Sequence, residues 1–275
     1  MMTPWPAIIL WGCIVSSAWG QRSPHPDSAP PARAAGADKA RLSIVGAAHA
    51  VAGVLLYREA RAAWGESNGR FHIKDDWTGD DLAQSDEISH LVTGYHLTKA
   101  FSRVWGWTGM RRQRARTLAA VEAAALLTFV EVPLDAFNPR QGLGVEDLAF
   151  DYIGVGIGLV ALSHPGRWDV KFSAKENPFR AQENLFAQSS RDADNYVFWA
   201  TYRLPLGPGG RQPISLGLGH GVRRAGDGQR AVRELYLGVG TTVPDVVRAV
   251  APGAARHFEV LGPYYFNVRL RATVQ

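Results

Sequence analysis

The sequence predicts an α+β protein in which an N-terminal bundle of about four helices is followed by a small antiparallel β-sheet packed on it. Residues 38–164 place apolar side chains at helical spacing in long runs, which is typical of core helices. Residues 195–275 instead alternate apolar and polar side chains, which is typical of half-buried strands. The chain has 275 residues, 46% of them hydrophobic, so it is long and apolar enough to build a packed core.

The N-terminus has the composition of an export signal. Residues 1–20 carry no charge, and an apolar run from Ala7 to Val15 precedes small residues up to Gly20. We expect a signal peptide over residues 1–20, with an uncleaved anchor or a lipoprotein cysteine at Cys13 as the alternatives. Residues 21–37 are rich in proline, alanine and serine, which predicts a disordered leader. The predicted location is the periplasm or a membrane-associated place in a bacterial envelope.

A single cysteine, which lies inside the predicted signal, limits the chemistry of the mature chain. Disulfides, thiolate metal sites and a cysteine nucleophile are excluded together. The net charge of +5 suits docking to a membrane surface or an anionic envelope lipid, although scattered arginines alone also explain it. The basic run at residues 111–116 is short and lacks interleaved aromatic residues, so no nucleic-acid partner is expected.

The helical half, residues 38–164, divides into four segments. The expected helices are Lys39–Trp64, Ser85–Trp105, Leu118–Leu134 and Leu148–Leu162. Asp38 is placed to cap the first helix, and Pro133 is expected to end or kink the third. Three of the four contain apolar runs that are shorter than the roughly 20 residues of a membrane span and include ionisable groups. We therefore expect a compact bundle, peripheral to or partly sunk in a membrane, rather than integral spans.

The second half is predicted to be an antiparallel sheet of about four strands. The expected strands are residues 195–204, 214–222, 234–243 and 264–274, separated by Pro/Gly loops. Residues 165–194 are expected to connect the two halves irregularly. Glycines at 217, 219 and 221 occupy one face of their strand, which would let another element approach the sheet closely.

Ionisable residues recur at i,i+4 spacing in the apolar helices, and this spacing puts each pair on one helix face. The pairs are Asp86/His90, Glu131/Asp135 and Asp147/Asp151. A carboxylate beside an imidazole raises its basicity and fixes its tautomer, so Asp86/His90 suits a general base or a metal ligand. An N-terminal acid next to an ordinary core histidine is the alternative.

The Glu131/Asp135 pair suits a hard cation or acid–base chemistry, whereas Asp147 alone is an ordinary first-turn acid. For Glu131 and Asp135 the alternative is that Asp135 caps the turn while Glu131 pairs with Arg140. Asp151 is expected to be buried against a partner, because apolar side chains surround it. His72 and Asp76 are further metal-ligand candidates in an acidic loop, where solvated acids are the alternative. A divalent metal is thus the one cofactor that the sequence suggests.

Several segments resemble a known family. They are Phe71-His72, Asp76-Trp77, Asp86-x-x-x-His90, Glu131…Asp135-Ala-Phe137, Glu146-Asp147, Asp194–Trp199, Leu216–Gly219 and Arg233–Gly238. Together they are similar to the DUF2279 family of predicted periplasmic, YfiM-like proteins. The stretch from Phe137 to Gly154 also resembles the VanZ-like membrane proteins. The resemblance implies an envelope location and a helical core, but no established reaction. The chain departs from the pattern at Glu87, where lysine is expected, and at Asp151, where asparagine is usual.

Two hypotheses follow for function. The first is a non-catalytic envelope protein with a buried Asp/His/Glu network and a β half that docks a lipid, glycan or protein partner. The second is a hydrolase acting on a membrane-derived substrate. In the second, Asp86 and His90 form the base pair, Glu131, Asp135 and Asp151 hold a cation, and Arg140 binds an anionic group. Convergence of the six residues in a water-accessible pocket would favour the enzyme, and a sealed, mutually paired set would favour the structural role.

Overall fold

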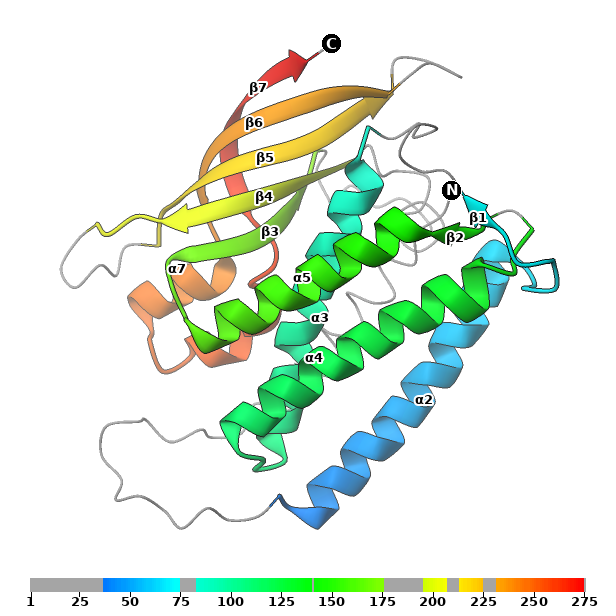
Figure 1. Ribbon diagram of the computed structural model, residues 1–275. Coiled ribbons are helices and arrows are strands. Elements are labelled where there is room, and N and C mark those ends of the chain that lie inside the picture. The colour runs from blue at the N-terminus through cyan, green and yellow to red at the C-terminus, as the bar shows by residue number, and fades with distance from the viewer. Residues whose placement is uncertain are drawn as a thin grey trace.

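The computed structural model describes residues 37–74, 83–139, 141–175, 195–206, 213–224 and 231–274. The predicted signal peptide, nearly all of the predicted leader, Asp76 and Arg140 lie outside these residues. Within them the predicted α+β class is confirmed: helices pack beneath a five-stranded antiparallel sheet, and α2 is the helix farthest from the sheet (Figure 1).

Helices occur in both halves of the chain. They are α2 Lys39–Trp64, α3 Ser85–Trp107, α4 Arg112–Phe129, the π-helix η1 Val130–Asp135, α5 Val145–Ser163, α7 Val243–Val250 and the 3₁₀ helix η4 Ala255–Leu261. Two short strands, β1 Ile73–Lys74 and β2 Leu143–Gly144, pair in parallel within the helical half. The expected order of four helices followed by a sheet is therefore wrong in detail, because α7 and η4 interrupt the sheet and β1 and β2 interrupt the helices.

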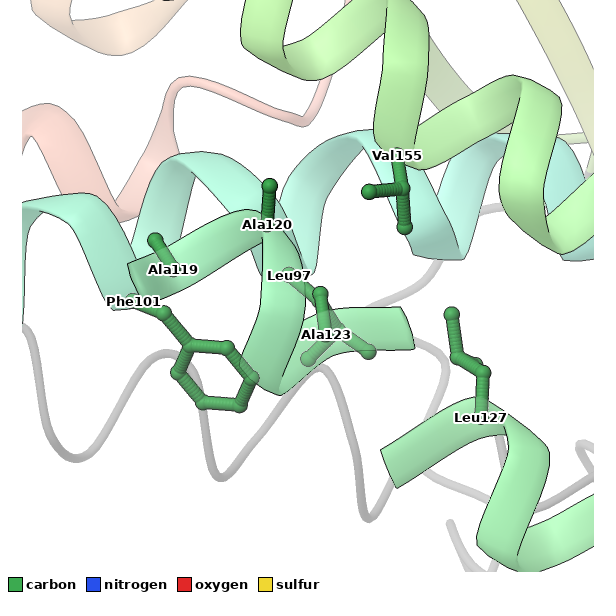
Figure 2. Packing of buried hydrophobic residues seen from close by; sticks show 7 residues of the cluster. All are labelled: Leu97, Phe101, Ala119, Ala120, Ala123, Leu127 and Val155. Carbon is green, nitrogen blue, oxygen red and sulfur yellow. The ribbon is translucent and has the colours of Figure 1, made fainter. Parts of the chain in front are cut away.

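The helical core lies between α3, α4 and α5. Its buried residues are Leu97, Phe101, Ala119, Ala120, Ala123, Leu127 and Val155 (Figure 2). Three of the α4 residues are alanines, and small side chains let a helix approach its neighbours closely. Phe101 and Leu127 fill the remaining space, so removal of either would leave a cavity that is costly in free energy of unfolding.

Two glycines bring α3 and α5 into backbone contact. A Cβ added at Gly154 would lie 2.1 Å from the carbonyl oxygen of Leu91, and a Cβ at Gly94 would lie 2.4 Å from that of Asp151. Neither contact is sterically tolerable, so any side chain at these positions would force the helices apart. The close crossing is what brings His90 on α3 next to Asp151 on α5.

Helix α2 contacts the bundle near its N-terminus and at His49 but exposes much of its apolar surface. Asp38 caps it as predicted, accepting hydrogen bonds from the backbone amides of Ala40 and Arg41 at 2.9 and 3.3 Å. His49 forms an ion pair with Glu122 of α4. Two stretches, Lys39–Arg58 and Arg112–Asp135, are long and apolar enough to cross a membrane by length and composition, a test that core helices also pass.

The third helix passes into the π-helix η1, which contains Pro133 and ends at Asp135, close to the predicted end. Proline has no backbone N–H and cannot make the i→i−4 bond, and here the ladder passes to i→i−5 spacing. The amide of Ala136 accordingly donates to the carbonyl oxygen of Glu131 at 3.0 Å. The helix also begins at Arg112 rather than at Leu118. The wider turn carries Glu131 and Asp135 to the end of the bundle where α3 and α5 begin.

The sheet has the strand order β3-β4-β5-β6-β7. Its strands are β3 Trp168–Ala174, β4 Tyr196–Arg203, β5 Ser215–Arg224, β6 Ala231–Thr241 and β7 Phe266–Val274. The last four confirm the predicted strands to within a few residues at each end. Strand β3 was not predicted: it lies in the segment expected to be irregular.

The sheet curls until its two edges meet. The amide of Phe172 in β3 donates to Pro263 O at 3.0 Å, and the amide of Tyr265, just before β7, donates to Phe172 O at 2.8 Å. Trp199 fills the enclosed inner face and lies over glycines of the neighbouring strands. A Cβ at Gly219 or Gly238 would come within 2.9 Å of its ring. The predicted close approach at the β5 glycines is therefore made by a cross-strand tryptophan, not by a separate element.

Candidate functional site

Six ionisable residues predicted from i,i+4 spacing lie near one another where α3, η1 and α5 meet. They form the acidic cluster, defined as Asp86, His90, Glu131, Asp135, Asp147 and Asp151, together with Lys74 of β1. Each helix contributes one pair. The convergence follows from local folding: the first turns of α3 and α5 meet because of the glycine crossing, and the π-turn places η1 beside them.

His90 lies between two pairs of carboxylates and presents one ring nitrogen to each. Its Nδ1 is 3.1 Å from Asp151 Oδ1 and 3.8 Å from Glu131 Oε1. Its Nε2 is 3.8 Å from Asp147 Oδ1 and 4.0 Å from Asp86 Oδ1. Asp151, on another helix, is thus at hydrogen-bond distance, whereas the predicted partner Asp86 lies 4.0 Å from Nε2. An Nδ1–H donated to Asp151 fixes the ring and turns Nε2 toward Asp147 and Asp86.

Lys74 of strand β1 forms an ion pair with Asp147 of the cluster. Its ammonium group lies 2.8 Å from Asp147 Oδ2, and the Lys74 side chain is 13% exposed. Asp135 is close enough to Lys74 and His90 for both cations to lower its pKa. The short parallel pairing of β1 with β2 places Lys74 here, because β2 leads directly into α5. No sequence periodicity identifies a two-residue strand, which is why this cation was missed.

The acidic cluster is nearly closed to solvent and contains carboxylate oxygens without hydrogen bonds. The side chains of Asp151, Asp147 and Glu131 are 0%, 2% and 3% exposed, whereas Asp86 and His90 retain 12% and 13%. Among the described residues, Glu131 Oε2, Asp135 Oδ1 and Asp151 Oδ2 are buried with no hydrogen-bond partner. Such orphaned oxygens are rare, because each costs free energy unless a proton or a cation compensates it.

Burial raises the pKa of Glu131 to about 8, against the opposing effect of His90. Burial likewise raises the pKa of Asp135 to about 7 and that of Asp151 above its ordinary value. Burial alone would lower the pKa of His90, but Asp151, Asp147 and Glu131 outweigh it and raise that pKa well above 6.5. Without a bound cation the cluster therefore retains protons near neutral pH.

Two sets of three side chains within the cluster could hold a metal ion. They are Asp86/His90/Asp147 and His90/Glu131/Asp151, and in each set the ligand atoms lie within 4.8 Å of one another. The first set uses Nε2 and includes the two more exposed residues. The second uses Nδ1, whose hydrogen bond to Asp151 already satisfies it. One imidazole and two carboxylates is a donor set that first-row transition metals and zinc accept readily.

The remaining sequence candidates fall elsewhere. His72 is half-buried beside β1, where its Nδ1 lies 3.2 Å from Arg70 O and its ring packs against Gly142. Asp76 and Arg140 lie outside the described residues, so the predicted pairing of Glu131 with Arg140 is untested. Asp135 does not only cap the turn: its carbonyl oxygen accepts hydrogen bonds from Asn138 and Gly142 while its side chain joins the cluster.

A second polar group joins the helices to the sheet and was not predicted. Asp169 of β3 accepts hydrogen bonds from Tyr95, from Lys99 at 2.9 Å and from Lys171 at 2.6 Å. Burial alone would raise the pKa of Asp169, but Lys171 and Lys99 hold it far below its ordinary value. Burial raises the pKa of Tyr95 and lowers those of Lys99 and His96, the last to about 3. In contrast to the acidic cluster, this group surrounds one carboxylate with two ammonium groups.

Comparison of the chain with protein-family models, with curated proteins and with solved structures found no match. The resemblance to the DUF2279 and VanZ-like families therefore stays a prediction, and the function must be argued from the cluster itself.

Proposed function

We propose that this chain is a cell-envelope protein that binds one divalent transition-metal ion in the acidic cluster, with Asp86, His90 and Asp147 as ligands. The observation that carries the proposal is that the two ring nitrogens of His90 face different carboxylates. Nδ1 lies at hydrogen-bond distance, 3.1 Å, from Asp151 Oδ1, and Nε2 faces Asp147 and Asp86 at 3.8 and 4.0 Å. Metal-binding histidines usually donate their other ring N–H to a carboxylate in this way.

The distances suit an ion placed between the three side chains. Zinc-like ions bind imidazole nitrogen and carboxylate oxygen at about 2.0–2.2 Å, so the ligand atoms of a tetrahedral site lie about 3.3–3.6 Å apart. Side-chain shifts of less than about 1 Å would bring the 3.8 and 4.0 Å separations seen here into that range. The ammonium group of Lys74, 2.8 Å from Asp147 Oδ2, fixes the orientation of this carboxylate and leaves Oδ1 facing His90. The imidazole favours Zn²⁺ over Ca²⁺ and Mg²⁺, which prefer all-oxygen sites, and the two carboxylates also suit Mn²⁺. Binding would replace protons that the cluster otherwise retains.

The test is equilibrium binding of Mn²⁺ and Zn²⁺ to the full chain by titration calorimetry. We expect one ion per chain, no measurable binding in His90→Gln and Asp86→Asn, and affinity about 10–100-fold weaker in Asp151→Asn, which lacks only the supporting carboxylate. Glu146→Gln is the matched control, because it removes a carboxylate adjacent to Asp147 but outside the cluster. A wild-type chain that binds neither ion would overturn the proposal and leave the non-catalytic polar network as the role of the cluster.

Variants that unfold would make calorimetry uninformative, so a second measurement uses wild type alone. A ligand that binds only the folded state raises stability by about 2.7 kcal/mol at a hundred times its Kd. Added Mn²⁺ or Zn²⁺ should therefore raise the melting temperature, and Mg²⁺ at the same concentration should not. An equal response to all three ions would indicate non-specific screening of the acidic cluster.

A metal-dependent hydrolase is the second candidate, favoured by the partial exposure of Asp86 and His90 at 12% and 13%. Three protein ligands leave a coordination position for a water molecule, which a bound metal makes a nucleophile near neutral pH. The expected substrates are phosphate or carboxylate esters of membrane origin, with Arg140 at the anionic group. Metal-loaded protein should hydrolyse p-nitrophenyl phosphate or acetate, and Arg140→Gln should raise KM. Stoichiometric metal without turnover on either ester class would favour a structural metal.

A further inference from the structure

The outer face of the curled sheet is apolar and exposed, whereas the solvent-facing side of a sheet usually carries polar side chains. We define the outer face by six residues, Leu218, Leu235, Leu237, Val239, Val268 and Leu270. Their exposed fractions run from 49% for Leu235 and Val239 to 84% for Val268. The register aligns Leu218 with Leu237 and Leu237 with Leu270, so the side chains form continuous rows across β5, β6 and β7. An apolar patch of this kind marks an interaction surface.

The inner face holds the polar side chains that would normally point to water. Glu234 is 1% exposed and pairs there with Lys175 at 2.7 Å and with Arg271 at 3.2 Å. Arg269 reaches across to donate to the carbonyl oxygens of Ala174 and Lys175 at 3.3 and 2.8 Å. Because the charges are paired inside the curl, the apolar outer face is a consistent feature of all three strands and not one stray residue.

Arginines flank the apolar rows at both ends of the strands. At one end Arg203, Arg248 and Arg103 form a chain of ion pairs through Asp245 and Glu259, which leaves one positive charge in excess. At the same end exposed Arg167 precedes Trp168, which is 66% exposed and stacks near Tyr202 with ring centroids 4.9 Å apart. At the opposite end lie Arg223, which is 54% exposed and 3.8 Å from Glu234 Oε1, and exposed Arg233, which donates a hydrogen bond to Gln84 of the helical half. This charge is complementary to anionic headgroups, and exposed tryptophan suits the interface.

We propose that the outer face docks on the surface of an anionic lipid bilayer, with its leucine and valine rows against the acyl chains and the flanking arginines at the headgroups. The rows from Leu235 to Val239 extend four residues along the strand, roughly 13 Å. A sheet that spans a bilayer needs an apolar band of about 25 Å, so this face rests in one leaflet and does not cross. The proposal does not depend on metal binding.

A second copy of the chain is the less suitable occupant. The face is the convex side of a curled sheet, so two copies would touch along a narrow line and leave most of the leucines exposed. The same flanking arginines would also meet one another across such an interface, which repels. Fluid acyl chains adapt to a convex surface, and headgroup phosphates accept the arginines.

The test places a fluorescent label at a single outer-face position of the full chain. Cys13→Ser removes the native thiol, and Leu270→Cys or the control Val160→Cys, in α5 and 62% exposed, introduces the new one. On vesicles with anionic lipid, iodide quenching at position 270 should fall by roughly threefold, because the side chain enters the headgroup–acyl boundary. Quenching at position 160 should stay unchanged. The predicted signal segment is common to both proteins, so the comparison reports on the sheet alone.

Arg223→Gln and Arg233→Gln test the charge separately. Each should weaken binding to anionic vesicles about fivefold at low salt and leave binding to neutral vesicles unaltered. Equal quenching at position 270 with and without vesicles would overturn the proposal. Protection at position 270 without vesicles, tracking a dimer in sedimentation, would assign the face to a second copy instead. Loss of vesicle binding with metal binding retained would separate this result from the cation site.

Discussion

His90 can exist in two states because each ring nitrogen faces its own pair of carboxylates. As an imidazolium it donates to Asp151 through Nδ1 and points Nε2–H toward Asp86 and Asp147. As a neutral ligand it keeps the first bond and offers the Nε2 lone pair to a metal ion. A proton and a divalent cation therefore compete for the same atom, and metal binding should strengthen as pH rises.

A second histidine, His49, gives a pH prediction outside the acidic cluster. Its ion pair with Glu122 raises the pKa of His49 above 6.5. Because the folded pKa lies above the unfolded value, the pair stabilises fully below pH 6.5 and its contribution is lost as pH rises through the folded pKa. Glu122→Gln, which keeps an acceptor for the indole N–H of Trp105, should cost about 1–2 kcal/mol at pH 5.5 and little at pH 9.

Urea unfolding of wild type and Glu122→Gln at both pH values measures this difference, with Glu146→Gln as the carboxylate control. A cost that is the same at pH 5.5 and pH 9 would contradict the prediction, since it would mean that the ion pair contributes through packing and not through the charge of His49.

At the scale of elements, the α3–α5 crossing determines the geometry of the cluster. Gly154→Ala would put a methyl group 2.1 Å from the carbonyl oxygen of Leu91, and only a shift of one helix relieves that clash. We expect a loss of about 2–3 kcal/mol in the free energy of unfolding, as for other overpacked core positions. Metal affinity should fall with it, because the shift separates His90 from Asp147.

Gly156 is the matched control for this substitution. It lies in the same helix two residues away, and a Cβ there meets nothing within 4 Å. Gly156→Ala should stabilise the protein by about 0.5–1 kcal/mol, because alanine is the better helix former. Denaturant unfolding and metal titration on both variants check the pair. Equal effects of the two substitutions would show that close backbone contact does not hold the site.

The sequence predicts the local features of the fold and the cluster, but not the long-range ones. The i,i+4 pairs were predicted because a helix repeats locally, and so were the bounds of α2 and of four strands. The cross-helix bond from His90 to Asp151 depends on how α3 packs on α5, which no local pattern encodes. Strand β3 was missed because its alternating charged residues, Asp169 and Lys171, point into the protein instead of toward water.

At the scale of the whole molecule, the two halves are joined chiefly through α3 and the sheet, and Asp169 is central to that junction. It is the shared acceptor of Tyr95 and Lys99 from α3 and of Lys171 from its own strand. Lys171 is 3% exposed, so its ammonium group depends on this carboxylate and on Gly262 O at 3.3 Å. Because Asp169 binds side chains of both α3 and the sheet, we expect the helical half and the sheet half to unfold as one cooperative unit.

Asp169→Asn should weaken that cooperativity. It keeps the shape but leaves two lysines without a carboxylate, and breaking a largely buried ion pair costs on the order of 3 kcal/mol. In scanning calorimetry of wild type, the helical half and the sheet half should unfold in one transition. In Asp169→Asn the melting temperature should fall and the transition should split into two. Tyr95→Phe removes one hydrogen bond, should cost about 1 kcal/mol and should keep a single transition. One unshifted transition in Asp169→Asn would mean that the apolar contacts of α3 with β3, β4 and β5 suffice to couple the halves, and that Asp169 only orients its lysines.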